Sequence, residues 1–364
     1  MSITRQPVYE RTPCAYDESF LTSYEPNVTS YIPSSQRKKL EKLGKRFSDH
    51  DPAGTYAHQI FNRLLIDLSY NSSRLEGNTY SLLDTERLLL SGEGAQGKLD
   101  EEKIMILNHK EAIRYLVENA RRIQLTEKTI LTLHYLLSDG LIQPQYSGKI
   151  RDHWARVSGS VYLPDEDITR LKKRFKAIIT KAQAIQNPFE QSLFLLVHLS
   201  YLQVFSDVNK RCTRIASNIP LICHNFVPLS FNDVERDDYM SAMISIYEQL
   251  NVRPICDLFI FSYTRTCLAY DASVEAFGFD EVRVRYRLER RQIIREVIIN
   301  LLTGSKMEKY IKGAAANVIP KTDQEAFIQD VHEDLKQIDA SRLVGLGVTQ
   351  KQLSDWKKHD NSQI

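Results

Sequence analysis

The residues best suited to chemistry lie in one short segment, Tyr201–Arg214, which reads YLQVFSDVNKRCTR. An apolar helix is predicted to end near Phe205, and after a polar turn a new helix is predicted to begin around Asn209. Backbone N–H groups at a helix start lack intrahelical partners, and the helix dipole is positive there, so such a start attracts anions. Three cationic side chains stand on its first turns: Lys210, Arg211 and Arg214.

A carboxylate belongs to the same turn. Asp207 stands two residues before Asn209, and carboxylate oxygens together with substrate phosphates are the usual ligands of Mg²⁺. The segment therefore predicts a phosphate-binding helix N-terminus with a metal-binding carboxylate. The alternative that the charge pattern leaves open is a capped helix with a cluster of surface salt bridges.

The order and spacing of these residues resemble a known signature. FSDVNKRCTR is similar to the Fic-domain signature H-P-F-x-D/E-G-N-G/K-R-x-x-R. The resemblance implies an enzyme that transfers part of a nucleotide, most often AMP from ATP, to a hydroxyl of a target protein. It assigns catalysis to Gln203, Asp207, Asn209, Lys210 and Arg211, and ATP binding to Phe205, Asn209, Lys210, Arg211 and Arg214.

The resemblance also implies a role for each of four side chains at the phosphates. Asp207 would hold Mg²⁺, and Asn209 would contact the α-phosphate. Arg211 would bind the β-phosphate, and Arg214 would reach the γ-phosphate. ATP and Mg²⁺ are accordingly the predicted cofactors.

A second segment, Ser72–Asn78 (SSRLEGN), resembles the S/T-x-x-x-E-G/N inhibitory motif of one Fic subclass. The resemblance makes Ser72 and Glu76 inhibitory residues, with Glu76 paired to Arg214 and blocking the γ-phosphate. The residues alone point the same way, because a carboxylate in the last turn of a helix faces the negative end of the dipole and a cationic partner would offset that cost. The alternative is an ordinary exposed glutamate.

A third segment lies between the other two in the chain. Ser147–Arg151 (SGKIR) is followed by Val157–Pro164, which predicts a short β-hairpin turning at Gly159. Together they resemble the G-x-x-R stretch and β-hairpin flap of the Fic family, and the flap would lay the target segment beside it by strand addition. The predicted flap residues are Val157, Ser158, Gly159, Ser160, Val161 and Tyr162. The whole resemblance covers roughly residues 56–270.

One departure from the signature concerns the general base. Gln203 stands where the family has its histidine, and an amide cannot accept a proton at neutral pH, although it can orient a hydroxyl. Loss of a positioned base typically costs about 10²–10⁴ in rate. His198 lies about 140° away around the helix, so it is predicted to be a packed or a surface histidine and not a substitute base.

Three further departures affect the shape of the anion loop. Val204 replaces the proline, and Val208 replaces the first glycine. A β-branched residue disfavours a positive φ, so the loop is predicted to be shaped differently at Val208. Lys210 replaces the commoner glycine and resembles the N-K-R form of the Doc branch, which transfers a phosphoryl group instead of AMP.

Composition sets the fold class and the compartment. The 364 residues hold 48 Lys+Arg and 46 Asp+Glu, so the net charge of +2 gives no electrostatic case for wholesale binding to nucleic acid or membrane. Few glycines and long runs rich in Leu, Ile, Lys and Glu predict a mostly α-helical protein: a Fic-type helical bundle with a small β-hairpin flap and a helical C-terminal region. Five cysteines without a C-x-x-C pair are typical of free thiols. With no apolar stretch of signal-peptide or membrane-span length, the prediction is cytoplasmic.

The predicted domains are an N-terminal arm (1–55), a Fic-like domain (56–280) with its inhibitory helix over about 58–77, and a helical C-terminal region (281–364). Apolar spacing places helices over residues 58–75, 84–90, 102–121, 126–140, 237–250 and 254–277, and a further helix that opens at Asn187, runs through Tyr201 and ends near Phe205. In the C-terminal region, Val348–Trp356 fits the second helix of a helix-turn-helix, with Gly345 and Gly347 before it. A winged-helix or helix-turn-helix arrangement competes there with a packing or dimerisation element. An arginine run lies just upstream: Arg283, Arg285, Arg287, Arg290, Arg291 and Arg295.

Three functions remain open from the sequence. The first is ATP-dependent modification of a hydroxyl on a protein target. A second is a nucleotide-binding pseudoenzyme that lacks the catalytic histidine and acts as a binding or regulatory module. A third is a DNA-binding regulator that uses the C-terminal region. The partners implied are a protein with a hydroxyl side chain, a second copy of this chain and, for the third function, DNA; no membrane is implied. The sequence does not identify the target.

Overall fold

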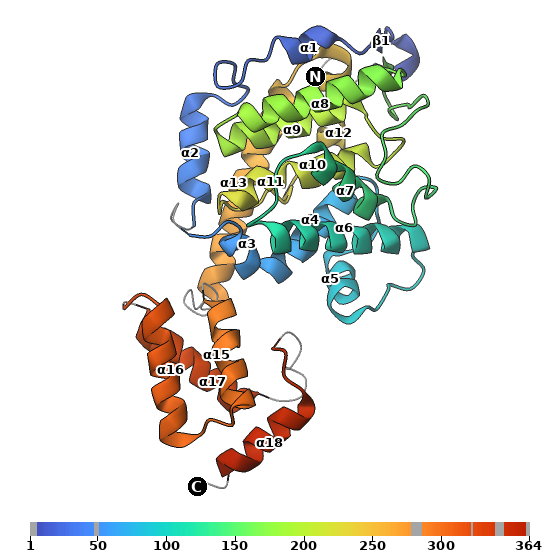
Figure 1. The fold of residues 1–364 in the computed structure, drawn as a ribbon. Coiled ribbons are helices and arrows are strands. Elements are labelled where there is room, and N and C mark those ends of the chain that lie inside the picture. Colours follow the sequence, from blue (N-terminus) through green and yellow to red (C-terminus); the bar gives the residue numbers. More distant parts are fainter. Residues whose placement is uncertain (1–5, 47–50, 278–285, 322, 339–345, 362–364) are drawn as a thin grey trace. The chain divides into compact units, whose positions relative to one another are not determined.

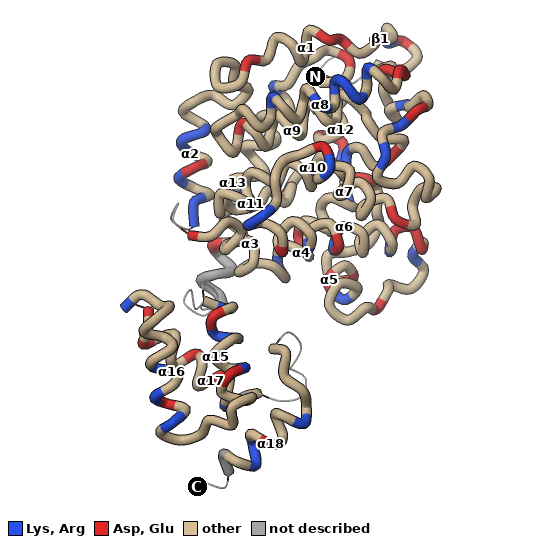
Figure 2. Tube along the Cα trace, viewed as in Figure 1, with Lys and Arg blue, Asp and Glu red and all other residues tan. Residues whose placement is uncertain are grey.

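The computed structural model describes residues 6–46, 51–277, 286–321, 323–338 and 346–361. It is mostly helical, as the sequence predicts, with a small two-stranded sheet (Figure 1). The chain divides into two compact units, residues 1–273 and residues 274–364. Lys and Arg occur together with Asp and Glu in both units, in line with the balanced charge of the sequence (Figure 2). In the described part of the chain, no helix has the length and apolar character to cross a membrane.

The elements of the first unit begin and end as follows: the 3₁₀ turn η2 Val8–Glu10, β1 Cys14–Ala15, α1 Glu18–Thr22, α2 Ser34–Gly44, α3 Thr55–Gln59, α4 Phe61–Arg74, α5 Leu82–Ser91, α6 Asp100–Asn119, α7 Glu127–Ser138, β2 Tyr162–Leu163, α8 Ile168–Ala184, α9 Pro188–Leu202, α10 Asn209–Ala216, α11 Asn218–Cys223, α12 Arg236–Gln249 and α13 Arg253–Phe277, which continues past the boundary between the units.

Helix α9 is the centre of the first unit. The Asn187 side chain accepts the N–H groups of Phe189 and Glu190, and Pro188 occupies the first helical position, which confirms the predicted helix start. Every residue from Pro188 to Leu202 is buried except Gln191, and a helix that is apolar on all sides belongs in a core. Helices α2, α8, α10, α11 and α12 pack around it.

The remaining helices form a succession of neighbours that reaches the same core. Helix α5 packs on α4 and α6, α4 packs on α6, α6 on α7, and α7 on α10. Helix α10 in turn packs on α9 and touches α4. The C-terminal end of α4, which carries the SSRLEGN segment, is therefore brought to α10, which carries the cationic turn (Figure 1).

The N-terminal segment packs onto the core of the first unit. Apolar side chains from it are buried there: Phe20, Leu21, Tyr24, Ile32 and Leu40. The Glu190 carboxylate on α9 accepts hydrogen bonds from Tyr24 Oη, Ser30 Oγ and the backbone N–H groups of Tyr31 and Ile32. Because each acceptor oxygen of this buried carboxylate is engaged, the segment is tied to α9 along its length.

The predicted β-hairpin at Val157–Leu163 is wrong. Gly159 does turn the chain, with φ of 76°, and Ser160 N–H reaches the Val157 carbonyl, but the residues before the turn form no strand. Strand β2 pairs instead with β1 from the N-terminal segment, in parallel, with Cys14 opposite Tyr162 and Ala15 opposite Leu163. The partner strand of β2 is therefore a segment far away in the chain and not the adjacent residues, as a hairpin would require.

The second unit has its own apolar core. Its helices are α15 Arg287–Ile299, α16 Gly304–Val318, α17 Gln324–Gln337 and α18 Gln350–Asn361. Side chains from all four meet in this core, among them Val297, Ile311, Phe327 and Trp356. Helix α18 contains most of the predicted Val348–Trp356 recognition helix, but Arg283, Arg285 and Gly345 lie outside the described residues, so the helix-turn-helix interpretation stays a prediction.

Candidate anion-binding site

The signature segment forms the turn between α9 and α10. Gln203 ends α9 in the left-handed conformation, with φ of 51°, so the helix stops before the predicted end at Phe205. Helix α10 begins at Asn209, as predicted. Val208 just before it has φ of 63°, so the prediction that valine excludes a glycine-like backbone here is wrong. Its side chain is buried in the core, and that burial offsets the cost of about 1–2 kcal/mol of the left-handed backbone.

Asn209 braces the turn from inside. Its Oδ1 accepts the Phe205 N–H and its Nδ2 donates to the Phe205 carbonyl, each at 2.9 Å. The amide therefore closes a loop of five residues and is engaged on both sides. Its predicted contact with an α-phosphate stays a prediction.

His134 on α7 supports the same turn from the other side, and the sequence analysis missed it. Its ring lies flat on Phe205, with centroids 3.8 Å apart and an interplanar angle of 6°. Nδ1 accepts the Gly148 N–H, so Nε2 carries the proton that points to the Asp207 carbonyl 3.2 Å away. Burial lowers the pKa of His134 to about 4, so the ring is neutral. The only sequence signal for it was a polar residue on the buried face of a helix.

Arg211 is a buried cation with open donors. The residue is 7% exposed, its Nε and Nη1 have no hydrogen-bond partner, and its Nη2 lies 4.0 Å from Asp207 Oδ2. Burial lowers the pKa of Arg211, although the carboxylates of Glu76 and Asp207 act in the opposite direction. An unsatisfied buried donor costs about 1–3 kcal/mol, more when charged, so an anion that reaches these two N–H groups is bound strongly.

Asp207 stands at the mouth of the turn. Its side chain is 70% exposed, and Oδ1 accepts the N–H of Val208 at 2.6 Å, while Oδ2 faces Arg211. No group of three His, Cys, Asp or Glu side chains that would hold a metal ion occurs among the described residues. A single exposed carboxylate beside an anion site fits Mg²⁺, which takes one or two carboxylates together with substrate phosphates.

Arg214 is fully buried, and every terminal of its guanidinium is engaged. Nε donates to Ser72 Oγ, Nη2 donates to the Ser72 carbonyl and to Glu76 Oε1, and Nη1 lies 3.2 Å from Tyr239 Oη. The Glu76 Oε2 atom lies 3.4 Å from the Nζ of Lys210. Burial opposes the charge on Glu76, but Arg214, Lys210 and Arg211 outweigh it and lower the pKa to about 2. The structure thus brings both predicted inhibitory residues onto the predicted arginine.

His109 on α6 holds Ser72 in place and was also missed. Its Nδ1 lies 2.8 Å from the Met105 carbonyl, so Nδ1 carries the proton and Nε2 accepts from Ser72 Oγ at 2.8 Å. The Ser72 hydroxyl therefore donates to His109 and accepts from Arg214. Burial lowers the pKa of His109 to about 3. The ring is neutral, which suits a position near two arginines.

Gln203 points its side chain into the protein. Its Nε2 donates to the Ser200 carbonyl at 2.7 Å and lies 3.3 Å from Tyr247 Oη, and the residue is 6% exposed. His198 is packed, as predicted: its Nε2 lies 2.8 Å from Tyr31 Oη among aromatic rings. Neither group presents a free base at the turn.

Arg151, from the G-x-x-R stretch, joins the flap segment to the turn. Its Nε donates to the Gln203 carbonyl at 2.7 Å, and its N–H donates to the Val204 carbonyl at 3.1 Å. Its other nitrogens bind the carbonyls of His153 and Asp165. The flap turn that follows leaves Ser158 and Gly159 exposed and buries Val157 and Tyr162.

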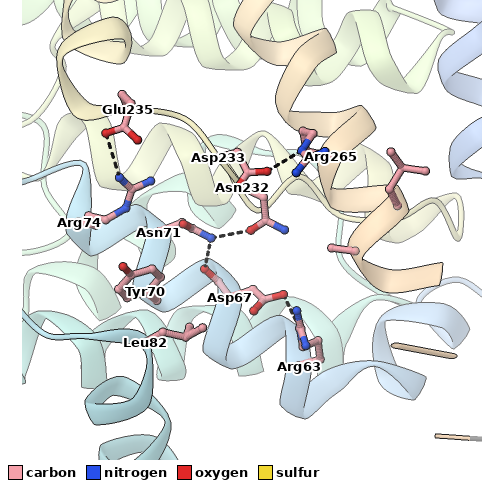
Figure 3. A pocket seen from close by; sticks show the side chains of 12 residues that line it. Arg63, Asp67, Tyr70, Asn71, Arg74, Leu82, Asn232, Asp233, Glu235 and Arg265 are labelled. Atoms are coloured by element: carbon pink, nitrogen blue, oxygen red, sulfur yellow. Dashed lines mark hydrogen bonds and ion pairs between the residues drawn. The ribbon is translucent and has the colours of Figure 1, made fainter. Parts of the chain in front are cut away.

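A separate polar cavity of about 590 Å³ opens on another face of α4 (Figure 3). Among its lining residues, ion pairs join Arg63 to Asp67, one turn apart on α4, and Arg265 to Asp233, and Arg74 Nη1 lies 3.8 Å from Glu235 Oε2. No predicted site residue lines this cavity. The arginines of this cavity already face carboxylates of the chain. Arg211 has two N–H groups without a partner, so the turn before α10 is the better candidate for an anion site.

The fold is that of a mostly helical protein, and the turn carries cationic side chains at the start of α10. Residues 124–221 match the model of the Fic/DOC family, and this match spans the flap segment, the turn and α10. The chain therefore carries a Fic/DOC family domain, as the resemblance of its motifs implies.

Known proteins resemble this chain beyond that domain. A protein adenylyltransferase Fic of Nematostella vectensis is 28% identical over 257 residues, which are 67% of this chain and 57% of that protein. A protein adenylyltransferase Fic of Culex quinquefasciatus is 26% identical over 235 residues, 62% of this chain and 46% of that protein. The chain thus spans about half the length of the curated relatives it matches.

Two solved structures share the fold. Fic-1 of C. elegans (aa134–508) superposes with a TM-score of 0.52 at 19% identity, over 71% of this chain and 73% of that one. A Fic family protein of Desulfovibrio desulfuricans G20 superposes with a TM-score of 0.52 at 16% identity, over 85% of this chain and 92% of that one. The helical arrangement around α9 is therefore a Fic fold.

Proposed function

We propose that the chain binds ATP at the N-terminus of α10 and transfers AMP to a hydroxyl side chain of a target protein. The observation that carries this is Arg211, a buried guanidinium whose Nε and Nη1 lack a partner at a helix start. The relatives named protein adenylyltransferase support the reaction type. In this reaction the hydroxyl oxygen bonds to the α-phosphorus, the bond from that phosphorus to the bridging oxygen of the β-phosphate breaks, pyrophosphate leaves, and the hydroxyl proton passes to solvent.

In this proposal each phosphate of ATP is bound by a different side chain of the turn and of α10. Arg211 binds the β-phosphate with its two open donors, and Lys210 adds charge beside it. Phe205 and Asn209 hold the shape of the turn, with Asn209 nearest the α-phosphate. Asp207 holds Mg²⁺, which neutralises phosphate charge when it is bound. Arg214 receives the γ-phosphate once Glu76 has left it.

Glu76 keeps the site in an inhibited state. Its carboxylate takes Nη2 of Arg214 at 2.7 Å and faces the Nζ of Lys210 at 3.4 Å. A γ-phosphate carries the same sign of charge and would compete for the same donors. ATP therefore binds fully only when the Ser72–Asn78 segment moves away.

A second candidate function is a nucleotide-binding pseudoenzyme, and the side chain of Gln203 favours it. The amide is turned inward to Ser200 and Tyr247, so the side chain at the position of the signature histidine does not accept the hydroxyl proton. Transfer of a phosphoryl group is a further alternative, which Lys210 supports by its resemblance to the Doc branch. All three candidates share the same ATP site.

Two labelled-ATP incubations separate these candidates. The chain and its Glu76→Gly variant are incubated with a target-containing lysate and with ATP labelled on the α- or the γ-phosphate. Protein labelled only from the α-phosphate establishes AMP transfer, and protein labelled only from the γ-phosphate establishes phosphoryl transfer. No label from either, with a melting temperature that ATP raises, establishes the pseudoenzyme. A melting temperature that ATP does not change in either protein refutes the site itself.

A further inference from the structure

The N-terminal segment already occupies one edge of the flap strand. Cys14 N–H donates to the Val161 carbonyl, and Tyr16 N–H donates to the Leu163 carbonyl, so the N-terminal segment fills one edge of β2. On the rest of the strand, Val161 N–H binds Glu248 Oε1 at 3.0 Å, and Tyr162 N–H binds Ser160 Oγ at 3.2 Å. A target that adds as a strand must therefore displace what is already there.

Side chains fix the N-terminal segment at this edge. The Tyr16 ring stacks on Tyr201 of α9, with centroids 4.9 Å apart, and the Arg174 guanidinium lies 4.2 Å above the same ring. Asp17 N–H donates to Tyr201 Oη at 2.8 Å, and Cys14 lies with its Sγ 3.5 Å from the Tyr247 carbonyl. The first unit therefore binds the N-terminal segment through its side chains as well as through its backbone.

Glu248 on α12 joins this segment to the flap turn. Its Oε1 accepts from Arg11 Nη1 at 3.0 Å, from Ser160 Oγ at 2.6 Å and from Val161 N–H at 3.0 Å. The Glu248 side chain is 5% exposed and that of Arg11 is 7% exposed, so the ion pair is shielded from solvent. A cation is thus bound three residues before the small side chain of Cys14 and five before the aromatic ring of Tyr16.

We propose that Arg11–Tyr16 occupies the docking edge of β2 as an internal pseudo-target. The inference rests on the proposed function in one respect, that β2 is where a target protein docks. The contacts then describe the target: an extended segment that runs parallel to β2, with a cation for Glu248, a small residue in the place of Cys14 and an aromatic residue in the place of Tyr16. A target of this pattern must outcompete a segment that is tethered to the same chain, which raises the concentration it needs.

The pseudo-target and Glu76 occupy the binding sites of two different substrates, the target protein and ATP. Glu76 occupies Arg214 at the polyphosphate site, whereas Arg11–Tyr16 occupies the strand that would hold the hydroxyl-bearing protein. Release of one contact is expected to leave the other in place, because the two ion pairs use different residues: Glu76 with Arg214, and Arg11 with Glu248. Full activity therefore requires both the removal of Glu76 and the displacement of the N-terminal segment.

A peptide supplied in trans tests the proposal without ATP. The probe is a fluorescent peptide with the sequence of residues 9–18, YERTPCAYDE. In the full chain, Arg11→Glu sets two carboxylates against each other at Glu248 and expels the tethered segment, whereas the peptide keeps its arginine. The Arg11→Glu chain is expected to bind the peptide at least about tenfold more tightly than the unmodified chain, the factor that corresponds to one or two net backbone hydrogen bonds.

The matched control is Lys38→Glu, the same charge change at an exposed lysine on α2, which is expected to bind the peptide as weakly as the unmodified chain. A peptide with Glu in place of its Arg is expected to lose the gain. Equal peptide affinity for the Arg11→Glu chain and the unmodified chain, with both unfolding cooperatively, overturns the proposal. If Arg11→Glu does not fold, Cys14→Pro, which removes the ladder N–H, carries the same expectation and the same refutation. Failure of ATP to bind leaves this result untouched and refutes only the nucleotide site.

Discussion

Oε1 of Glu76 lies 2.7 Å from Nη2 of Arg214, and the same guanidinium donates to both the Oγ and the carbonyl of Ser72. The end of α4 therefore closes over the first turns of α10 through one fully buried cation. A buried charge that loses its partner destabilises a protein by about 3–5 kcal/mol, so this contact holds α4 against α10. Under the proposed function the same two residues would also inhibit the site, which would link inhibition to stability.

Replacing Glu76 with glycine is expected to lower the dissociation constant of ATP at least about tenfold and to lower the melting temperature of the ATP-free chain. The reason is that Arg214 is left without a carboxylate and takes the γ-phosphate in its place. Isothermal titration calorimetry gives the affinity, and thermal unfolding with and without ATP gives the stability. Glu76→Gln is the matched control, because it keeps the side chain in place without its charge, and an intermediate affinity is expected. Unchanged affinity in both variants would contradict the inhibitory role.

The charge of Glu76 also sets a pH dependence of stability. The pKa of Glu76 is lowered from 4.5 to about 2 in the folded chain, so the unfolded chain binds a proton first as the pH falls. The stabilisation, about 3 kcal/mol, is complete above pH 4.5 and is lost as the pH falls toward 2. Denaturant unfolding of the chain and of Glu76→Gln at a series of pH values measures it. The difference between the two should be constant from pH 8 to 5 and should shrink below that; a difference that changes near neutral pH would contradict the assignment.

Two buried histidines predict a second loss of stability at milder acidity. Burial lowers the pKa of His109 and of His198 from 6.5 to about 3, so both are neutral in the folded chain and become protonated in the unfolded chain below pH 6.5. Each is expected to reduce the free energy of unfolding by up to about 1.4 kcal/mol per pH unit between pH 6.5 and 3. Because the pKa of His134 is also lowered, to about 4, His198→Gln should flatten this slope by about a third between pH 6.5 and 4. The matched control is His224→Gln, the same substitution at an exposed histidine.

The sequence predicted those parts of the site that depend on neighbours in the chain. The cationic turn, the start of α10 and the Asn187 cap follow from spacing and helix chemistry over a few residues. His134 and His109 escaped prediction because their partners, Asp207 and Ser72, lie on other helices. A histidine on the buried face of a helix gives no sign of what the next helix presents to it.

The flap shows the same limit for strands. An apolar segment with a glycine predicts a hairpin when only local residues are considered, but the partner of Tyr162 is Cys14. At Val208 the local steric preference of a β-branched residue against a positive φ also predicted the wrong backbone. Burial of the valine side chain in the core offsets the cost of that backbone. Local rules therefore placed the motifs correctly and failed where a distant segment supplied the partner or the compensation.

Val208 gives a direct measure of that compensation. Val208→Gly removes a buried side chain but also relieves a left-handed backbone that costs about 1–2 kcal/mol in other residues. Val204, in the same turn, is equally buried and has a negative φ, so Val204→Gly removes a side chain without any relief. Denaturant unfolding is expected to show Val208→Gly at least about 1 kcal/mol less destabilising than Val204→Gly. Equal losses would mean that the backbone of Val208 is not strained.

Gln203→His is the change that separates a weak enzyme from a pseudoenzyme. Gln203 ends α9 at the position that the catalytic histidine of the Fic signature occupies, and an imidazole there would accept the hydroxyl proton that the amide cannot take. In a Glu76→Gly background, transfer of label from α-labelled ATP to protein is expected to rise by about 10²–10⁴. Gln203→Asn in the same background is the matched control and should give no rise, because it replaces one amide with another. If the histidine variant binds ATP and still transfers nothing, then Val208 and Lys210 have altered the turn so that the α-phosphate and the hydroxyl do not meet.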